Sequence, residues 1–115
     1  WKRISRLWEQ GIIKRQVSIL NAPQLGFGLT AYVSIKTGEH SGDWLNKFSK
    51  TVTGMPEVME FHRMAGDVDY MLKVVVADID AFDKFYKRLI TSSAISEVTS
   101  RFSMEKIKET TELPL

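Results

Sequence analysis

Cysteine is absent from the 115-residue chain, which contains three prolines and two histidines. Without cysteine there is no disulfide, no thiolate nucleophile and no thiolate ligand for a metal ion. His40 and His62 stand apart from each other and from any carboxylate cluster, so the spacing of a metal site is missing. The sequence also lacks a G-x-S-x-G motif and a phosphate-binding glycine loop. We therefore expect no catalytic residues, no metal and no cofactor.

Long apolar runs are missing as well. No stretch approaches the roughly 18–20 apolar residues of a membrane-spanning helix, and no signal-peptide pattern opens the chain. The hydrophobic content of 43% and charged content of 26% are typical of a soluble globular domain. Together with the absence of cysteine, these features favour a cytoplasmic protein without a membrane partner.

Charge is unevenly distributed along the chain. The overall net charge is +2, but residues 1–15 carry +4 and the remaining 100 residues carry −2. A basic front end on a weakly acidic body indicates contact with a polyanion such as DNA. The alternative is an ordinary solvent-exposed basic face of a helix.

The first 22 residues read as a separate piece. Residues 1–10 predict a helix with an apolar stripe of Ile4, Leu7 and Trp8, and Gly11 suits a left-handed C-terminal cap. Trp1 is no N-cap residue, so we expect this helix to start upstream of the chain. Residues 12–20 predict a short strand, and the Pro23 turn marks a boundary. We therefore expect a unit at 1–22 and a second unit at 23–115.

The second unit alternates between strand and helix periods in the order βαββαβ. We expect strands at 25–36, 57–64, 68–76 and 94–106, and helices from Asp43 to about Val52 and from Asp78 or Asp80 to Ile90. This order predicts an α+β, ferredoxin-like fold, with a four-stranded antiparallel sheet and both helices on one face.

Residues 68–76 are apolar on both strand faces, which is typical of a central strand that is covered on both sides. The helices cover one face, so we expect a second copy of the chain to cover the other, with the sheets pairing in a dimer. Asp67 and Asp69 lie beside Gly66 where this strand begins. They predict a ligand site, unless their carboxylates merely hold the turn by local hydrogen bonds.

Several short segments, taken in order, resemble the Lrp/AsnC family of bacterial and archaeal transcription regulators. The most specific is Gly66-Asp67-Val68-Asp69-Tyr70, which is similar to the family's signature loop. Residues 1–13 resemble the end of the family's recognition helix and the turn after it, and Asn21 with Leu25-Gly26 resembles its hinge. Residues 56–58 resemble its helix-to-strand turn, and Ile95 with residues 105–108 and 113–115 resembles its last strand and tail.

The resemblance implies an amino-acid-responsive transcriptional regulator. The chain would be chiefly the ligand-sensing and oligomerisation (RAM) domain, and residues 1–22 the remnant of a helix-turn-helix domain with its linker strand. A complete DNA reader needs helices ahead of this remnant. We therefore expect at most phosphate contacts from the remnant, through Lys2, Arg3 and Arg6. The family also implies a homodimer that assembles to an octamer or higher, with DNA and an amino acid as partners.

For the effector, the resemblance implies a site between neighbouring dimers. Asp69, and secondarily Asp67, would bind the ammonium group, while backbone N–H groups of the turn and the hydroxyls of Thr99 or Ser100 would bind the carboxylate. Arg101 stands where relatives have apolar residues, which argues against a simple leucine pocket. The complete set of expected effector-binding residues is Met64, Gly66, Asp67, Val68, Asp69, Ile79, Thr99, Ser100 and Phe102.

Two other functions remain open at this level. A stand-alone small-molecule-binding module could act on partner regulators by forming mixed oligomers, and an in-frame helix-turn-helix upstream would argue against it. A dimeric ferredoxin-like barrel enzyme would need a polar cavity between sheet and helices. The helix stripes, such as Phe82, Phe85 and Leu89, are apolar, which argues against an enzyme.

Overall fold

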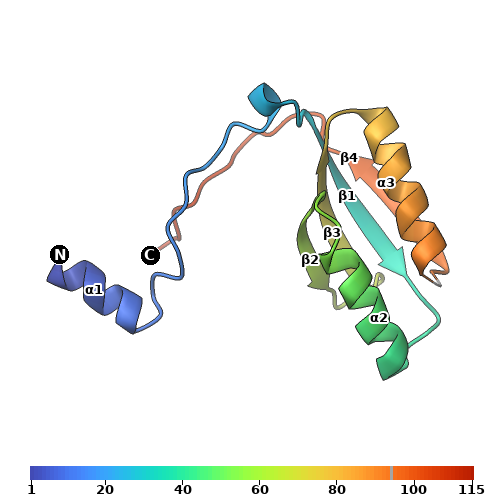
Figure 1. Cartoon of the computed structure of the whole chain (residues 1–115), viewed down its shortest axis with the longest axis horizontal. Helices are drawn as coiled ribbons and strands as arrows, with labels where there is room; N and C mark the ends of the chain where they lie inside the picture. Colours follow the sequence, from blue (N-terminus) through green and yellow to red (C-terminus); the bar gives the residue numbers. More distant parts are fainter. Residues whose placement is uncertain (94) are drawn as a thin grey trace.

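The computed structural model describes residues 1–93 and 95–115. Within these residues, two helices lie on one face of a four-stranded antiparallel sheet, and a third helix lies apart at the N-terminus (Figure 1). The sheet order β2-β3-β1-β4 is the ferredoxin-like order that the sequence predicts. The elements are α1 (Lys2–Glu9), the 3-10 turn η1 (Pro23–Leu25), β1 (Leu29–Lys36), α2 (Gly42–Thr53), β2 (Val58–Arg63), β3 (Tyr70–Val76), α3 (Ile79–Ser92) and β4 (Glu97–Phe102).

Strand β3 is central, as its composition predicts. It pairs with β1 on one side and with β2 on the other. Burial alternates along it: Tyr70, Leu72, Val74 and Val76 are buried under the helices, and the residues between them are half-buried on the other face. Like β1, β3 therefore has hydrogen-bonded neighbours on both sides and helices on one face.

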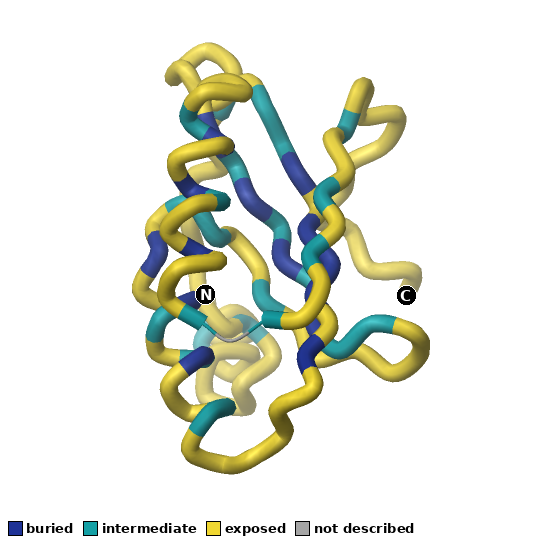
Figure 2. Tube along the Cα trace, turned by 90° about the vertical axis from the view of Figure 1, so that its right-hand side faces the viewer, coloured by how far each residue is buried: buried dark blue, intermediate teal, exposed yellow. Residues whose placement is uncertain are grey.

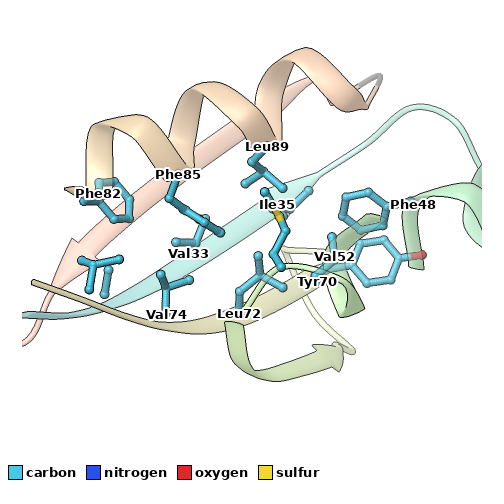
Figure 3. Packing of buried hydrophobic residues seen from close by; sticks show 13 residues of the cluster. Val33, Ile35, Phe48, Val52, Tyr70, Leu72, Val74, Phe82, Phe85 and Leu89 are labelled. Atoms are coloured by element: carbon cyan, nitrogen blue, oxygen red, sulfur yellow. The ribbon is translucent and has the colours of Figure 1, made fainter. Parts of the chain in front are cut away.

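The helices are held by N-caps that the sequence suggests. The Ser41 side chain accepts a hydrogen bond from the Trp44 N–H at the start of α2, and the Asp78 carboxylate accepts one from the Ala81 N–H at the start of α3. The predicted apolar stripes face the sheet and form the core. Figure 3 shows this packing, with buried side chains of both helices and of the two central strands: Val33, Ile35, Phe48, Val52, Tyr70, Leu72, Val74, Phe82, Phe85 and Leu89.

The second sheet face is more polar than we predicted from the sequence. Directly paired residues point to the same side of a sheet, so the register places Tyr32 with Lys73 and Arg101 on this face. Lys73 lies 3.7 Å from a Glu60 carboxylate oxygen, and Ser34 is only 4% exposed. Apolar surface remains at Met71 and Val75, so the face is mixed rather than uniformly apolar.

The predicted strand at residues 12–20 is wrong for this structure. After α1, Gly11 adopts φ +76° and ends the helix as expected, but residues 13–21 then run extended, outside any strand ladder of the described residues. A strand needs a neighbour to accept and donate its backbone hydrogen bonds, and this segment runs away from the sheet (Figure 1). The same segment and α1 are mostly exposed (Figure 2).

All four strands are shorter than expected: β2 loses one residue at each end, β3 begins at Tyr70 rather than at residue 68, and β1 and β4 differ most. β1 begins at Leu29 rather than at residue 25, because Gly26 adopts φ +89° and closes the η1 turn before the strand. β4 covers Glu97–Phe102 and is shorter than the predicted 94–106; Ala94 lies outside the described residues. None of the helices in the described part of the chain is long and apolar enough to cross a membrane.

Candidate functional site

The turn between β2 and β3 contains the predicted signature loop. Gly66 adopts φ +121°, a conformation that side chains disfavour. The Met64 N–H donates to the Asp69 carbonyl across the turn at 2.9 Å, and the Asp69 N–H donates to the Ile35 carbonyl on β1 at 2.9 Å. The turn is therefore closed on itself and fixed to the neighbouring strand.

Asp69 is half-buried, and its carboxylate makes a specific contact. Its Oδ2 accepts a hydrogen bond from the Thr37 backbone N–H at 2.9 Å. This bond crosses from the start of β3 to the loop after β1, so it is a long-range contact and not the local turn bond that we considered as the alternative. Asp67, in contrast, is exposed at the tip of the turn.

A cavity of about 290 Å³ lies beside this turn. Its volume is at the small end of the range for ligand pockets, roughly 300–1,000 Å³. One wall is aromatic: the Trp44 ring stacks on Phe48 at 4.7 Å and lies 6.5 Å from the Tyr70 ring. The cavity thus combines charged, aromatic and apolar groups, contributed by His40, Trp44, Leu45, Arg63, Met64, Asp69 and Tyr70.

The structure brings only part of the predicted site together. Met64, Gly66, Asp67, Val68 and Asp69 lie at the end of the sheet where β3 begins. Ile79 and Phe102 lie at the opposite end: Ile79 is the first residue of α3, and the Phe102 ring packs 5.0 Å from the Phe82 ring. The seven residues of β3 between these ends span about 20 Å. Within one subunit, the two groups therefore belong to different places.

Thr99 and Ser100, which we gave as alternative partners of the carboxylate, point to opposite faces of the sheet, so only one of them can face a given ligand within one chain. Thr99 is opposite Ser34 in the register, and Ser100 is opposite Val33. Val33 is fully buried under the helices. Ser100 therefore faces the helix layer, and Thr99 faces the open side of the sheet, because successive residues of a strand alternate.

Arg101 also faces the open side. Its Nη1 donates to the Ser34 hydroxyl at 3.2 Å, and the Ser34 hydroxyl lies 3.5 Å from the Met71 sulfur. The departure from the family that we noted at Arg101 thus affects the open sheet face and not the cavity beside Asp69.

A second polar group on the open face surrounds Glu60. His62 Nε2 lies 3.0 Å from one Glu60 carboxylate oxygen, and Lys73 Nζ lies 3.7 Å from the other. The hydrogen bond from His62, assisted by the charge of Lys73, lowers the pKa of Glu60 below its ordinary value of 4.5.

A larger cavity of about 1,020 Å³ lies over the open face, between the sheet, residues 18–28 and residues 103–109. Val75 and Lys73 line its floor, and no expected effector-binding residue lines it. The two extended segments therefore stand off the sheet and leave this face accessible.

The described residues contain no cluster of three or more histidines and carboxylates that would hold a metal ion. At the other end of the chain, Lys2, Arg3 and Arg6 are exposed on α1, as a phosphate-contacting role requires.

Sequence reasoning missed five residues that line the smaller cavity: His40, Trp44, Leu45, Arg63 and Tyr70. A signal for Arg63 was available, since it ends the strand that precedes the signature loop and pairs with Tyr70 in the register. Trp44 was assigned to the core stripe of α2, and the structure places it at the border between core and cavity.

Comparison with known proteins identifies relatives over nearly the whole chain. The family model of the Lrp/AsnC ligand binding domain matches residues 30–113. The chain is 51% identical over 116 residues to the DNA-binding transcriptional activator DecR of Escherichia coli K12, covering 100% of this chain and 76% of the relative. It is 45% identical over 115 residues to the glutamate uptake regulatory protein of Zymomonas mobilis, covering 100% of this chain and 70% of the relative.

Comparison with solved structures also identifies transcriptional regulators. An AsnC family transcriptional regulator from Agrobacterium tumefaciens superposes with a TM-score of 0.93 at 52% identity, covering 99% of this chain and 74% of that one. The transcriptional regulator NMB0573 of Neisseria meningitidis, solved as an L-Met complex, superposes with a TM-score of 0.92 at 27% identity, covering 98% and 73% of the two chains. The chain therefore belongs to the Lrp/AsnC family of transcriptional regulators and contains the ligand-binding domain of that family.

Proposed function

We propose that this regulator responds to an amino acid, which binds at the β2–β3 turn with its ammonium group on Asp69. The observation that carries the proposal is a half-buried carboxylate, fixed by the Thr37 N–H, at the border of an amino-acid-sized cavity. An ammonium group that leaves water needs a charged partner of this kind. The L-Met complex of the Neisseria regulator supports an amino acid as the ligand class.

The distant residues join the site only through a second copy of the chain. Ile79 and Phe102 are separated from Asp69 by the length of β3 in their own subunit. A second copy that presents the start of its α3 and the end of its β4 would cover the cavity and complete the predicted set. The proposal therefore includes a homo-oligomer, a dimer through the open sheet faces and further association that brings the turns to neighbouring subunits.

DNA is the second partner that we propose, for the complete regulator. Lys2, Arg3 and Arg6 of α1 provide phosphate contacts, which position a protein on DNA without reading its sequence. Base-specific reading requires a helix-turn-helix whose recognition helix enters the major groove. Amino-acid binding in the domain at 23–115 would then alter the spacing of the DNA-binding units by changing the assembly.

No observation favours an enzyme. The space between helices and sheet is occupied by buried side chains such as Phe48, Phe85 and Leu72. The polar groups described above lie on the open face or at the end of the sheet, and within residues 1–93 and 95–115 none of them pairs a nucleophile with a base.

A thermal-shift screen of the twenty amino acids tests the proposed function. A ligand at a hundred times its dissociation constant adds about 2.7 kcal/mol of stability, which is readily detected. Asp69→Asn keeps an acceptor for the Thr37 N–H but removes the charge, and Asp69→Ala removes both. We expect at least one amino acid to stabilise the wild type and to lose its effect on both variants. No response from the wild type, or an equal response from Asp69→Asn, contradicts the proposal.

A further inference from the structure

Arg63 lines the cavity beside Asp69, and neither the fold nor the sequence motif explains its role. It ends β2 and is exposed, and it pairs in the register with Tyr70, so it faces the helix side of the sheet. Among the described residues, no carboxylate lies within ion-pair distance of its guanidinium, whereas Arg88 and Lys87 both have acidic partners. A cation without an acidic partner that lines a cavity is available for an anionic ligand.

The opposite charge in the same cavity is already oriented. Asp69 lines the cavity with Arg63, yet the two do not pair with each other. Its carboxylate is directed by the Thr37 N–H instead. A cation and an anion that line one cavity and remain apart form the complement of a zwitterion, because each charge keeps one partner for the ligand.

The rest of the lining selects the side chain of the ligand. Trp44, Leu45 and Met64 contribute ring and alkyl surface to the same cavity. Figure 3 shows the Tyr70 ring beside Phe48, with its hydroxyl oxygen directed away from the core cluster. An apolar side chain gains from contact with this surface, whereas a second carboxylate there loses hydration without a second fixed cation. His40 belongs to the exposed loop before α2.

We infer that Arg63 binds the α-carboxylate of an apolar amino acid whose ammonium group Asp69 binds, so that one subunit supplies both charged partners. The inference rests on the proposed function and names the carboxylate partner and the side-chain class. The planar guanidinium suits a carboxylate because it can donate two parallel hydrogen bonds. A second copy then covers the ligand but provides none of its charge partners.

Three ligands that differ by one charge each test the inference: L-methionine, L-methioninamide and N-acetyl-L-methionine, with L-leucine as a second apolar probe. The amide lacks the carboxylate, and the acetyl compound lacks the ammonium. Binding is measured by isothermal titration calorimetry to the wild type, Arg63→Gln, Arg63→Lys and Asp69→Asn. Arg15→Gln, which removes an exposed arginine of the linker outside both cavities, is the matched control.

For the wild type we expect L-methionine to bind at least tenfold more tightly than either derivative. Arg63→Gln should weaken L-methionine binding about tenfold or more and abolish its advantage over the amide, while the advantage over N-acetyl-L-methionine persists. Arg63→Lys should restore part of the affinity for L-methionine. Asp69→Asn should lose the preference for L-methionine over N-acetyl-L-methionine. Arg15→Gln should behave like the wild type.

The outcomes separate the two proposals. If L-methionine or L-leucine binds but Arg63→Gln retains both the affinity and the preference over the amide, the role of Arg63 is refuted and the effector site at Asp69 stands. If both apolar probes fail while an acidic amino acid binds, the assignment of the side-chain class is refuted. If no amino acid binds the wild type, the proposed function itself is refuted. Circular dichroism of Arg63→Gln, expected to match the wild type, confirms that a loss of binding is not a loss of fold.

Discussion

At the scale of single residues, one carboxylate has both a structural and a binding role. Asp69 connects the start of β3 to the loop after β1 through the Thr37 N–H, and the same side chain is our candidate partner for an ammonium group. A group that is fixed before the ligand arrives loses little conformational freedom on binding. The structural bond therefore favours the binding role rather than replacing it.

The two roles respond differently to substitution. Asp69→Ala leaves the Thr37 N–H without its acceptor, and we expect the free energy of unfolding to fall by about 1–2 kcal/mol. Asp69→Asn keeps a neutral acceptor and should lose less than half as much. Urea denaturation measures both values. Equal losses in the two variants would show that the charge, and not the hydrogen bond, stabilises the turn.

The Glu60 group on the open sheet face gives a pH-dependent prediction. The His62 hydrogen bond and the charge of Lys73 lower the pKa of Glu60 in the folded chain below 4.5. A lowered pKa stabilises the folded state above the unfolded pKa, and this contribution disappears as the pH falls through the folded pKa. We expect His62→Ala to raise the pKa of Glu60 toward 4.5, as followed by NMR titration of its side-chain carboxyl carbon. An unchanged value would exclude His62 as the main cause.

At the scale of elements, the two packed helices follow from their own sequences, whereas one predicted strand does not form. α2 and α3 have a cap residue, a helical apolar stripe and a residue that ends the stripe, and these act within a few residues of one another. A strand depends on a neighbour that is distant in sequence. Residues 12–20 have β-favouring side chains, but no strand of the described residues lies beside them.

The apolar stripe of α3 predicts that substitutions at two adjacent residues lower the stability by different amounts. Leu89 is fully buried, while Ile90 is 39% exposed. We expect Leu89→Ala to lower the free energy of unfolding by about 2–5 kcal/mol, because it leaves a cavity in the core. Ile90→Ala should cost less than about 1 kcal/mol. Urea denaturation of the two variants checks the difference, and similar losses would mean that α3 is rotated relative to the sheet.

At the scale of the whole molecule, the open sheet face is the dimer interface that we propose. It carries apolar surface between charged groups and lies under a large cavity between the two extended segments. A face of this kind suits a second copy better than water. The polar groups would then fix the register of the two sheets, because unpaired charges at a dimer interface are costly.

A substitution at Tyr32 tests the assembly. Tyr32 is 43% exposed and lies between Lys73 and Arg101 in the register, so a glutamate there has cationic neighbours in the monomer. We expect the wild type to scatter light as a particle at least twice the 13.2 kDa chain mass at micromolar concentration. Tyr32→Glu should shift it toward the monomer with unchanged circular dichroism, and Ile90→Glu on the outer helix surface should not. A folded wild-type monomer would refute the proposed dimer.

Features that depend on residues close together in the chain were predicted more fully than contacts between residues that are distant in the chain. The two helices after residue 40, the central position of β3 and the family were predicted from residues that are close together in the chain or from short segments in order, and the structure and comparisons confirm them. The candidate site was predicted only in part. The expected residues of its turn lie together, but Arg63 was missed, and Thr99 and Ser100, given as alternative partners of one carboxylate, lie on opposite faces of the sheet.

The sequence alone determined the element order, the apolar stripes and the signature loop, because these depend on periodicity and on local backbone preferences. The tertiary structure decided which of those residues meet. Register placed Ser100 and Thr99 on opposite faces, and strand length separated Ile79 and Phe102 from Asp69. The packing of α2 beside the β2–β3 turn put Trp44 in one cavity with Arg63 and Asp69. Such contacts arise from alignment between distant segments, and no single segment encodes that alignment.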